Sequence, residues 1–490
     1  MTSSGVEMML VPFHGQGHIF PCTQLSLQLA ARGVTVTVVV PSEVAPSISA
    51  ACNHPLVRIA ELPLPPNPPG APPQHQFLRS RLMVEPFAEL IARRAAPGSS
   101  DPPPPICVVI DALVGWAVEI CQRHGLPSAV FFTNGTAACA LEYIGYHLPL
   151  DDLNPDEPVS IEGLPDSLGL TYADLIHKPP GSQMPPPMAL PGFNPPPFFP
   201  GGGPPGGRRF PPWVPEVESA AVFLFNTCDE LERPFIECIA REAKKKAFGV
   251  GPLLPPQLWE SAGAPLRDGA VRAKKSSGIS EEEVEAWLAS KRRGSVVFVS
   301  FGSEVSPSVP ELANLAAGLE ESGQPFIWVI QPNARRAGSP FGAPPEDPWS
   351  GVVPEGFEKR VEGRGLVVRG WAPQLLILSH PSTGGFISHC GWNSTLEALV
   401  QGVPILGWPI RGDQHQTAIL VANYLRVGFK IRSARGREVS KEDVVKGLEK
   451  LMGNAEVKKR ASEIKSIFSS GFPASSSASL DAFVHLFRRE

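Results

Sequence analysis

Several features that define whole classes of protein are missing from this sequence of 490 residues. It contains no unbroken apolar run of about 18 residues, the length that a membrane-spanning helix needs. Its 43 basic and 48 acidic residues give a net charge of −5, so no basic excess favours nucleic acid or an anionic membrane surface. Residues 1–13 lack a basic segment followed by a cleavage site, so we expect no secretion signal. These absences predict a cytoplasmic protein with no membrane span and no nucleic-acid partner.

Cysteine motifs are missing as well. The eight cysteines are scattered through the chain without a Cys-x-x-Cys pair. In a chain of this size such scattered cysteines are typical of reduced thiols, and they disfavour a disulfide framework or a zinc site.

Proline, by contrast, is abundant, with 57 in the chain. Fifteen of them fall within the 37 residues 179–215, together with runs of glycine. This composition permits neither a helix nor a central strand, so we interpret the stretch as a surface insertion. It is either a neutral loop or a lid over a binding site. Across the whole chain, 42% of the residues are apolar, which is enough to build two large domains.

Strands and helices alternate through both halves of the chain. The β-branched run 34–40 follows an apolar run at 8–13 and a helical stretch at 21–31, which is the order of a βαβ unit. The same alternation predicts buried strands at 106–110, 128–132, 221–225, 295–300, 326–330, 365–368, 385–388 and 403–406. We therefore predict an α/β protein with two Rossmann-like, doubly wound parallel-sheet domains that face each other across a cleft.

The domain boundaries follow from changes in composition. We expect a first domain at 1–247 and a second at 280–465, joined by a polar linker at 248–279 that is rich in glycine, proline and serine. The tail at 466–490 is expected to carry a short helix at 480–487 and to pack back towards the first domain.

A histidine and an aspartate follow two of the strands predicted for the first domain. His18 lies in the turn Gly15-Gln-Gly-His-Ile-Phe20, where an imidazole is suited to act as a general base near neutral pH. The turn half-matches the dinucleotide motif Gly-x-Gly-x-x-Gly, but Phe20 replaces the third glycine, which disfavours a nicotinamide-dependent reductase. Asp111 follows the strand at 106–110, where it either orients the imidazole or caps the next helix. The residue pattern leaves both roles open.

The second half carries a dense motif of 44 residues, from 371 to 414. It reads Trp371-Ala-Pro-Gln374, His380, Gly385-Phe-Ile-Ser-His-Cys-Gly-Trp-Asn-Ser394, Glu397, Gly402-Val-Pro404, Trp408-Pro409 and Asp413-Gln414. This motif resembles the signature box of the plant secondary-product UDP-glycosyltransferases. The pattern Pro12-Phe-x-Gly-Gln-Gly-His-x-x-Pro21 is similar to the same family. The resemblance implies an inverting, family 1 enzyme of the GT-B fold.

Each part of the box suits one part of a UDP-sugar. Trp371 offers an aromatic face to uracil, with Ala372 and Gln374 at the edges of the base. The helix after the strand 385–388 offers free N–H groups and a positive dipole end to a diphosphate. Glu397 is expected at the ribose, and Asp413 and Gln414 are expected at the hexose. The predicted donor-binding residues are Thr133, Ser303, Trp371, Ala372, Gln374, His389, Trp392, Asn393, Ser394, Glu397, Asp413 and Gln414. The first two rest on the resemblance alone.

The resemblance also implies a reaction. His18, with Asp111 as its partner, would deprotonate an acceptor bound mainly by the first domain, and the acceptor oxygen would displace UDP from glucose with inversion. In this family a terminal glutamine in the box, here Gln414, goes with glucose, and histidine there goes with galactose. No Asp-x-Asp occurs, which disfavours a metal-dependent transferase, so we expect neither a metal nor a bound cofactor besides the UDP-glucose co-substrate. We also expect a monomer.

The acceptor stays open at this point. A small phenolic compound of the flavonoid kind is the first expectation, on family frequency alone. C-glucosylation of a polyphenol and O-glucosylation of a terpenoid or steroid are the alternatives. A catalytically silent protein that binds nucleotide sugars is the alternative outside enzymes, and the presence of both His18 and Asp111 disfavours it.

Overall fold

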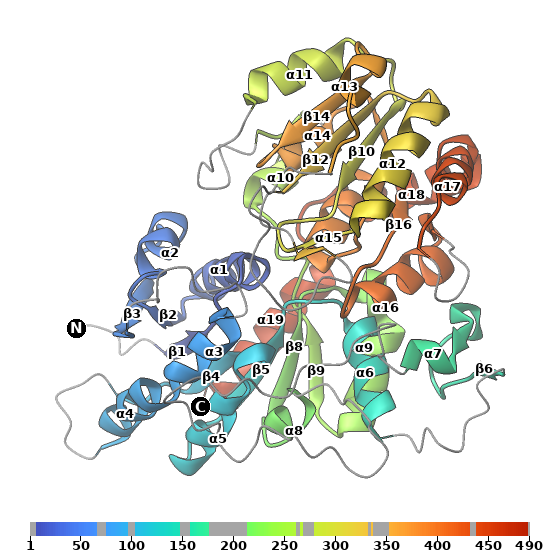
Figure 1. Ribbon diagram of the computed structural model, residues 1–490. Helices are drawn as coiled ribbons and strands as arrows, with labels where there is room; N and C mark the ends of the chain where they lie inside the picture. The colour runs from blue at the N-terminus through green and yellow to red at the C-terminus, as the bar shows by residue number, and fades with distance from the viewer. Residues whose placement is uncertain are drawn as a thin grey trace, which may run out of the picture.

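The computed structural model describes residues 6–65, 75–96, 103–147, 157–175, 213–260, 265–267, 279–331, 335–336, 352–431 and 438–488. Of the predicted proline-rich insertion at 179–215, residues 179–212 lie outside the described residues, so its role as loop or lid stays a prediction. Figure 1 shows two α/β units, a lower one in blue to green and an upper one in yellow to red. The predicted two-domain α/β architecture is confirmed.

The first sheet has seven strands, all parallel, in the order β3-β2-β1-β4-β5-β8-β9. Their bounds are β1 (Glu7–Val11), β2 (Thr35–Pro41), β3 (Val57–Leu62), β4 (Cys107–Asp111), β5 (Ser128–Phe132), β8 (Val222–Phe225) and β9 (Lys246–Gly249). Both faces are covered, because Met8 and Leu10 pack into one buried cluster and Met9 and Val11 into another. Strands covered on both faces need the continuous apolar runs that the sequence shows.

Helices and short elements connect these strands. The helices are α1 (Gln16–Ala30), α2 (Ala45–Ala51), α3 (His75–Leu82), α4 (Val84–Ala95), α5 (Trp116–Arg123), α6 (Thr136–His147), α7 (Tyr172–Leu175), α8 (Trp213–Val217) and α9 (Asp229–Ala243). Short helices η1 (Ala112–Val114) and η3 (Asp166–Leu168) and the hairpin of β6 (Pro158–Val159) and β7 (Leu170–Thr171) complete the described part of this unit.

The second sheet has six parallel strands in the order β14-β12-β10-β15-β16-β17. They are β10 (Val296–Ser300), β12 (Phe326–Ile330), β14 (Gly365–Arg369), β15 (Thr383–Ser388), β16 (Ile405–Gly407) and β17 (Gly428–Lys430), with a separate short pair β11 (Val305–Ser306) and β13 (Arg335–Arg336). The helices are α11 (Glu281–Ala289), α12 (Val309–Ser322), α13 (Phe357–Arg360), α14 (Gln374–Ser379), α15 (Trp392–Gln401), α16 (Gln414–Ile419), the π-helical η5 (Leu420–Tyr424), α17 (Lys441–Gly453) and α18 (Ala455–Ile467).

The strand order places one ligand-binding crevice in each sheet. In the first sheet β1 lies between β2 and β4, and in the second β10 lies between β12 and β15. At such points the chain leaves the sheet in opposite directions, so a crevice opens beyond the carboxyl ends of the strands. The segments after β1 and β4 and those after β10 and β15 are therefore the places to look for chemistry.

Helix α1 differs from the sequence-based expectation of a helix at 21–31. It begins at Gln16 and includes Pro21 in its interior. The prediction was wrong because proline is common in the first turn of a helix, which suggested a start there. His18 consequently lies in the first turn of α1 and not in a free turn. Pro21 has no N–H to donate to the carbonyl of Gly17 four residues earlier, so that carbonyl lacks its helical partner.

Helix α10 (Pro256–Glu260) lies in the chain between the two sheets, and the C-terminal helix α19 (Ala474–Phe487) follows the last helix of the second unit. Helix α19 is longer than the predicted helix at 480–487 and contacts α1, α9 and β9 of the first unit. Figure 1 shows this red helix lying among the elements of the lower unit, where Arg32 donates to Asp481 over 2.7 Å.

Two further findings concern the classes of protein considered above. All eight cysteines are buried and free, which confirms the prediction of unpaired thiols. Among the helices of the described residues, none is both long enough and apolar enough to span a membrane.

Candidate active site

A cavity of about 580 Å3 lies between the two units, at the carboxyl ends of their strands. His18 and all twelve predicted donor-binding residues line it: Thr133, Ser303, Trp371, Ala372, Gln374, His389, Trp392, Asn393, Ser394, Glu397, Asp413 and Gln414. The structure thus brings together residues that are up to about 400 positions apart in the chain, as a doubly wound fold allows. Asp111 does not line the cavity and lies behind His18.

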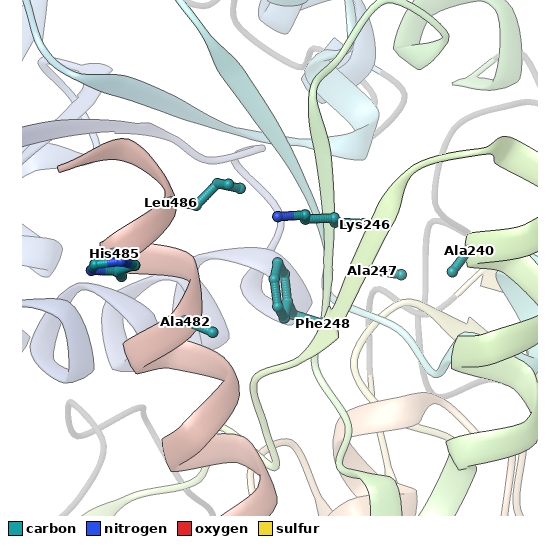
Figure 2. Close-up of a pocket in the computed structure, with 7 residues that line it drawn as sticks. All are labelled: Ala240, Lys246, Ala247, Phe248, Ala482, His485 and Leu486. Carbon is teal, nitrogen blue, oxygen red and sulfur yellow. The ribbon is translucent and has the colours of Figure 1, made fainter. Parts of the chain in front are cut away.

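A second hollow, of about 510 Å3, lies outside this cleft between α9, β9 and α19 (Figure 2). Figure 2 shows Phe248 between the helix and the strand. Of its seven lining residues, only Lys246 and His485 are ionisable, and the others are Ala240, Ala247, Phe248, Ala482 and Leu486. Since it offers no acid paired with a base, the cleft between the units is the candidate active site.

His18 is held by two polar side chains from neighbouring strand ends. Its Nδ1 lies 2.8 Å from Oδ2 of Asp111 and 3.1 Å from the hydroxyl of Thr133. The other oxygen of Asp111 accepts from the backbone N–H of Leu113 over 2.9 Å. Asp111 therefore both contacts the imidazole and caps η1, so the two roles left open by the sequence are both present. With Nδ1 turned to Asp111, Nε2 is the ring nitrogen left for a ligand.

The charges around His18 make its imidazole a stronger base. Burial pushes the pKa of His18 down, whereas the charge of Asp111 and its hydrogen bond push it up. Glu304 and Asp413 add to this effect, so the pKa of His18 is raised from its ordinary value. A carboxylate that is only 2% exposed interacts strongly with the imidazole, because little water screens the pair.

The junction between β15 and α15 has the backbone features of an anion-binding site. Cys390 has a φ of 62°, a left-handed conformation that non-glycine residues adopt mainly at constrained functional turns. Gly391 follows as the N-cap of α15, and it makes no side-chain cap to the first-turn N–H groups. Gly391 and the first residues of α15, Trp392, Asn393 and Ser394, line the cavity, so the N–H groups and the positive dipole end of this helix start suit a phosphate there.

His389 lies beside that helix start and is only 9% exposed. Burial and, to a smaller extent, the charge of Arg411 lower the pKa of His389 to about 4, against the opposing effect of a backbone hydrogen bond at Ser300. The imidazole is therefore neutral near pH 7 and can act as a hydrogen-bond donor without adding a charge. A Cβ at Gly302 or Gly391 would lie 2.7 or 2.3 Å from its Nε2, so only glycine leaves room for the ring on both sides.

The expected ribose site is organised by Gln374. Its amide nitrogen donates to Oε2 of Glu397 over 2.7 Å and to the hydroxyl of Ser394 over 3.0 Å. Glu397 is 1% exposed and still lines the cavity. Gln374 therefore fixes the Glu397 carboxylate, a contact that the sequence-based assignment of Gln374 to the uracil edge did not include.

The end of the motif is organised by Gln414. Its side-chain oxygen accepts the backbone N–H groups of Ile410 and Arg411 over 2.9 and 3.0 Å. Gln414 thus shapes the loop before α16 in addition to lining the cavity. Arg411 in turn donates to Glu304 over 2.8 Å, which joins this loop to the one that follows β10.

Two side chains at the start of α15 reach into the first unit. Asn393 donates to the carbonyl of Gly17 over 2.9 Å, the carbonyl that Pro21 leaves without a helical partner. The indole N–H of Trp392 donates to the carbonyl of Asn226 over 2.7 Å. The helix that faces the expected diphosphate is therefore bonded directly to the segment that carries His18.

Sequence reasoning missed some residues of the site. Glu304 and Arg411 line the cavity, yet neither was assigned a role. Glu304 lies just past the end of β10, where a strand-end position was a usable signal. Asn226, which accepts from Trp392 but does not line the cavity, gave no signal, because its partner lies far away in the chain. Within the residues that the structure describes, no group of three His, Cys, Asp or Glu side chains is placed to hold a metal ion.

Comparisons with known proteins agree with this geometry. Residues 266–470 match the family model for "UDP-glucoronosyl and UDP-glucosyl transferase". The chain is 30% identical to UDP-glycosyltransferase 73E1 of Stevia rebaudiana, over 92% of this chain and 89% of that protein. It is also 30% identical to UDP-glucose flavonoid 3-O-glucosyltransferase 7 of Fragaria ananassa, over 88% of this chain and 82% of that protein. The crystal structure of a UGT transferase from Siraitia grosvenorii in complex with UDP has a TM-score of 0.73 at 26% identity and covers 99% of this chain and 100% of its own.

Proposed function

Because this chain belongs to the plant family 1 UDP-glycosyltransferases, which are GT-B enzymes, we propose that it transfers glucose from UDP-glucose to a small phenolic acceptor with inversion. The observation that carries the proposal is the 2.8 Å contact between His18 and Asp111 at the edge of the donor-binding cavity. A base oriented by a buried carboxylate is what deprotonation of a phenolic hydroxyl requires. That pair also favours an enzyme over a silent nucleotide-sugar binding protein.

In the proposed mechanism, Nε2 of His18 takes the proton of the acceptor hydroxyl. The acceptor oxygen then forms a bond to the anomeric carbon of glucose while the bond from that carbon to the diphosphate breaks. Asp111 stabilises the imidazolium that results, as its position against Nδ1 allows. One displacement from an α-linked donor gives a β-glucoside and UDP.

In this proposal the negative charge that develops on the leaving diphosphate is stabilised by fixed dipoles of the protein. The first-turn N–H groups of α15 and the neutral imidazole of His389 would donate to its oxygens. Such donors are already in place before the reaction, so no reorganisation is needed as the charge develops. Glu397, fixed by Gln374, would accept from the ribose hydroxyls, and Trp371 would stack on uracil.

The choice of acceptor rests on the name of one relative. The strawberry relative is named a flavonoid 3-O-glucosyltransferase, which supports a phenolic acceptor of the flavonoid kind. C-glucosylation of a polyphenol and O-glucosylation of a terpenoid or steroid use the same base and remain alternatives. A cytoplasmic location, a monomeric state and independence from metal ions stay predictions.

The test is to incubate the protein with UDP-glucose and a panel of polyphenols and to identify the products by NMR. A β-linked O-glucoside of a flavonoid is the expected product. His18→Ala is the matched control, and it should lose about 10²–10⁴-fold in rate on a phenol of ordinary pKa. A fully active His18→Ala variant would refute the base assignment, whereas a sugar attached to carbon would leave the base in place and change the atom of the acceptor that attacks glucose.

A further inference from the structure

The contact between Trp392 and the first unit is buried and specific. Its indole N–H donates to the carbonyl of Asn226, just after β8, over 2.7 Å. Trp392 is only 4% exposed, and it is the first residue of α15, the helix that faces the expected diphosphate. A buried N–H that meets a carbonyl of another unit fixes both the distance and the direction between the two.

The Trp392 indole packs against Gly135 of the first unit. A Cβ at Gly135 would lie 2.9 Å from the Trp392 ring, so the ring rests directly on the glycine. Glu232, which is fully buried, accepts from the backbone N–H groups of Thr136 and Ala137 over 3.0 and 2.8 Å. These are the first residues of α6, so Glu232 fixes the start of the helix and with it the position of the preceding Gly135.

Asn226 is also connected by hydrogen bonds to His18, the proposed base. The side-chain amide of Asn226 donates to the carbonyl of Thr133 over 3.4 Å and accepts from the N–H of Leu253 over 2.8 Å. The hydroxyl of Thr133 lies 3.1 Å from Nδ1 of His18. A continuous set of contacts therefore runs from the start of α15 through Asn226 and Thr133 to His18.

We propose that Trp392 is a positioning residue that sets the distance between the diphosphate site on α15 and the pair His18–Thr133. The inference rests on the proposed function, because it takes His18 as the base that acts on the acceptor. Trp392 does this with its indole N–H bond to Asn226 and with its packing on Gly135. Donor and base come from different units, so a small shift of one unit separates the reacting atoms, and a misplacement of about 1 Å can cost about 10²-fold in rate.

The experiment compares Trp392→Phe with Gly135→Ala. The first keeps an aromatic ring and removes the N–H donor, and the second adds a methyl group that the indole must avoid. For both variants we expect kcat to fall about tenfold or more, while the Kd for UDP stays within about twofold of the wild-type value. Calorimetric titration gives the Kd, and steady-state kinetics below the melting temperature give kcat.

Asn423→Ala is the matched control. Asn423 also donates its side-chain amide to a backbone carbonyl of the first unit, that of Leu168, over 2.7 Å, but it does not line the cavity. Its loss should leave kcat unchanged. An equal drop in kcat for Asn423→Ala would mean that any contact between the units suffices, which would overturn the proposal.

Two further outcomes would also overturn it. A wild-type kcat in Trp392→Phe and Gly135→Ala would show that the contact does not position the base. A rise in the Kd for UDP that accounts for the whole loss in kcat/KM would make Trp392 a donor ligand only. His18→Ala in the same assay tests the proposed function separately, since its full activity would refute the base, whereas an effect of Trp392→Phe on kcat is measured independently of it.

Discussion

Replacing Asp111 with asparagine should disable His18 without moving it. The two oxygens of Asp111 face two donors, Nδ1 of His18 and the N–H of Leu113. Asparagine has one acceptor oxygen and an NH2 group in place of the other. If the oxygen stays on Leu113, the NH2 group faces Nδ1 and favours the tautomer that carries its proton on Nε2. That tautomer cannot take a proton from the acceptor.

The size of the loss follows from the role of the base. A general base contributes about 10²–10⁴-fold in rate, which corresponds to about 3 to 5 kcal/mol of transition-state stabilisation. Asp111→Asn should therefore lower kcat by about that factor on a phenol of ordinary pKa. The charge of Asp111 also raises the pKa of His18 in the wild-type protein. Any remaining activity should rise with pH at a lower pH than in the wild type, because His18 then loses its proton more easily.

The assay is a series of initial rates between about pH 5 and 9, with UDP binding and melting temperature measured alongside. Asp481→Asn is the matched control, since its carboxylate pairs with Arg32 at the surface, where an ion pair contributes about 1 kcal/mol or less. Rates within about threefold of the wild type for Asp111→Asn would refute the tautomer argument, provided that His18→Ala is inactive in the same assay.

The remaining predictions concern the donor site and the expected independence from metal ions. Gly391→Ala places a Cβ 2.3 Å from Nε2 of His389, so the ring must move and UDP affinity should fall about 10- to 100-fold by calorimetry; Gly453→Ala, with open space around its Cβ, should not change it. Gln414→His should reduce use of UDP-glucose relative to UDP-galactose in competition assays, whereas Trp371→Ala should weaken both donors alike; equal losses in the first variant would argue against a sugar-reading role. Treatment with EDTA should leave turnover unchanged, and recovery of lost turnover by added Mg²⁺ or Mn²⁺ would contradict the expectation of a metal-independent enzyme.

Much of the fold could be predicted because each strand carries a strong local signal. Strand β2 is β-branched from Thr35 to Val40, and β1, β4 and β5 each contain four consecutive apolar residues, a pattern typical of strands buried on both faces. The candidate site followed from the same pattern, since His18 and Asp111 are read as strand-end residues and strand ends meet at one edge of a parallel sheet. The start of α1 was misplaced because proline permits more than one position near a helix start.

The contacts between the units could not be predicted in this way, because their signals are divided between distant segments. Pro21 indicates that the carbonyl of Gly17 lacks a helical partner, and this can be read from the sequence once the helix start is known. Nothing local indicates that Asn393 supplies the missing donor, since that depends on how the two sheets dock. The box residues were assigned to the ligand alone, yet Trp392 and Asn393 also bind the unit that carries the proposed base, His18. A motif expected to bind the donor therefore also fixes the neighbouring unit, and only the docked structure reveals this second role.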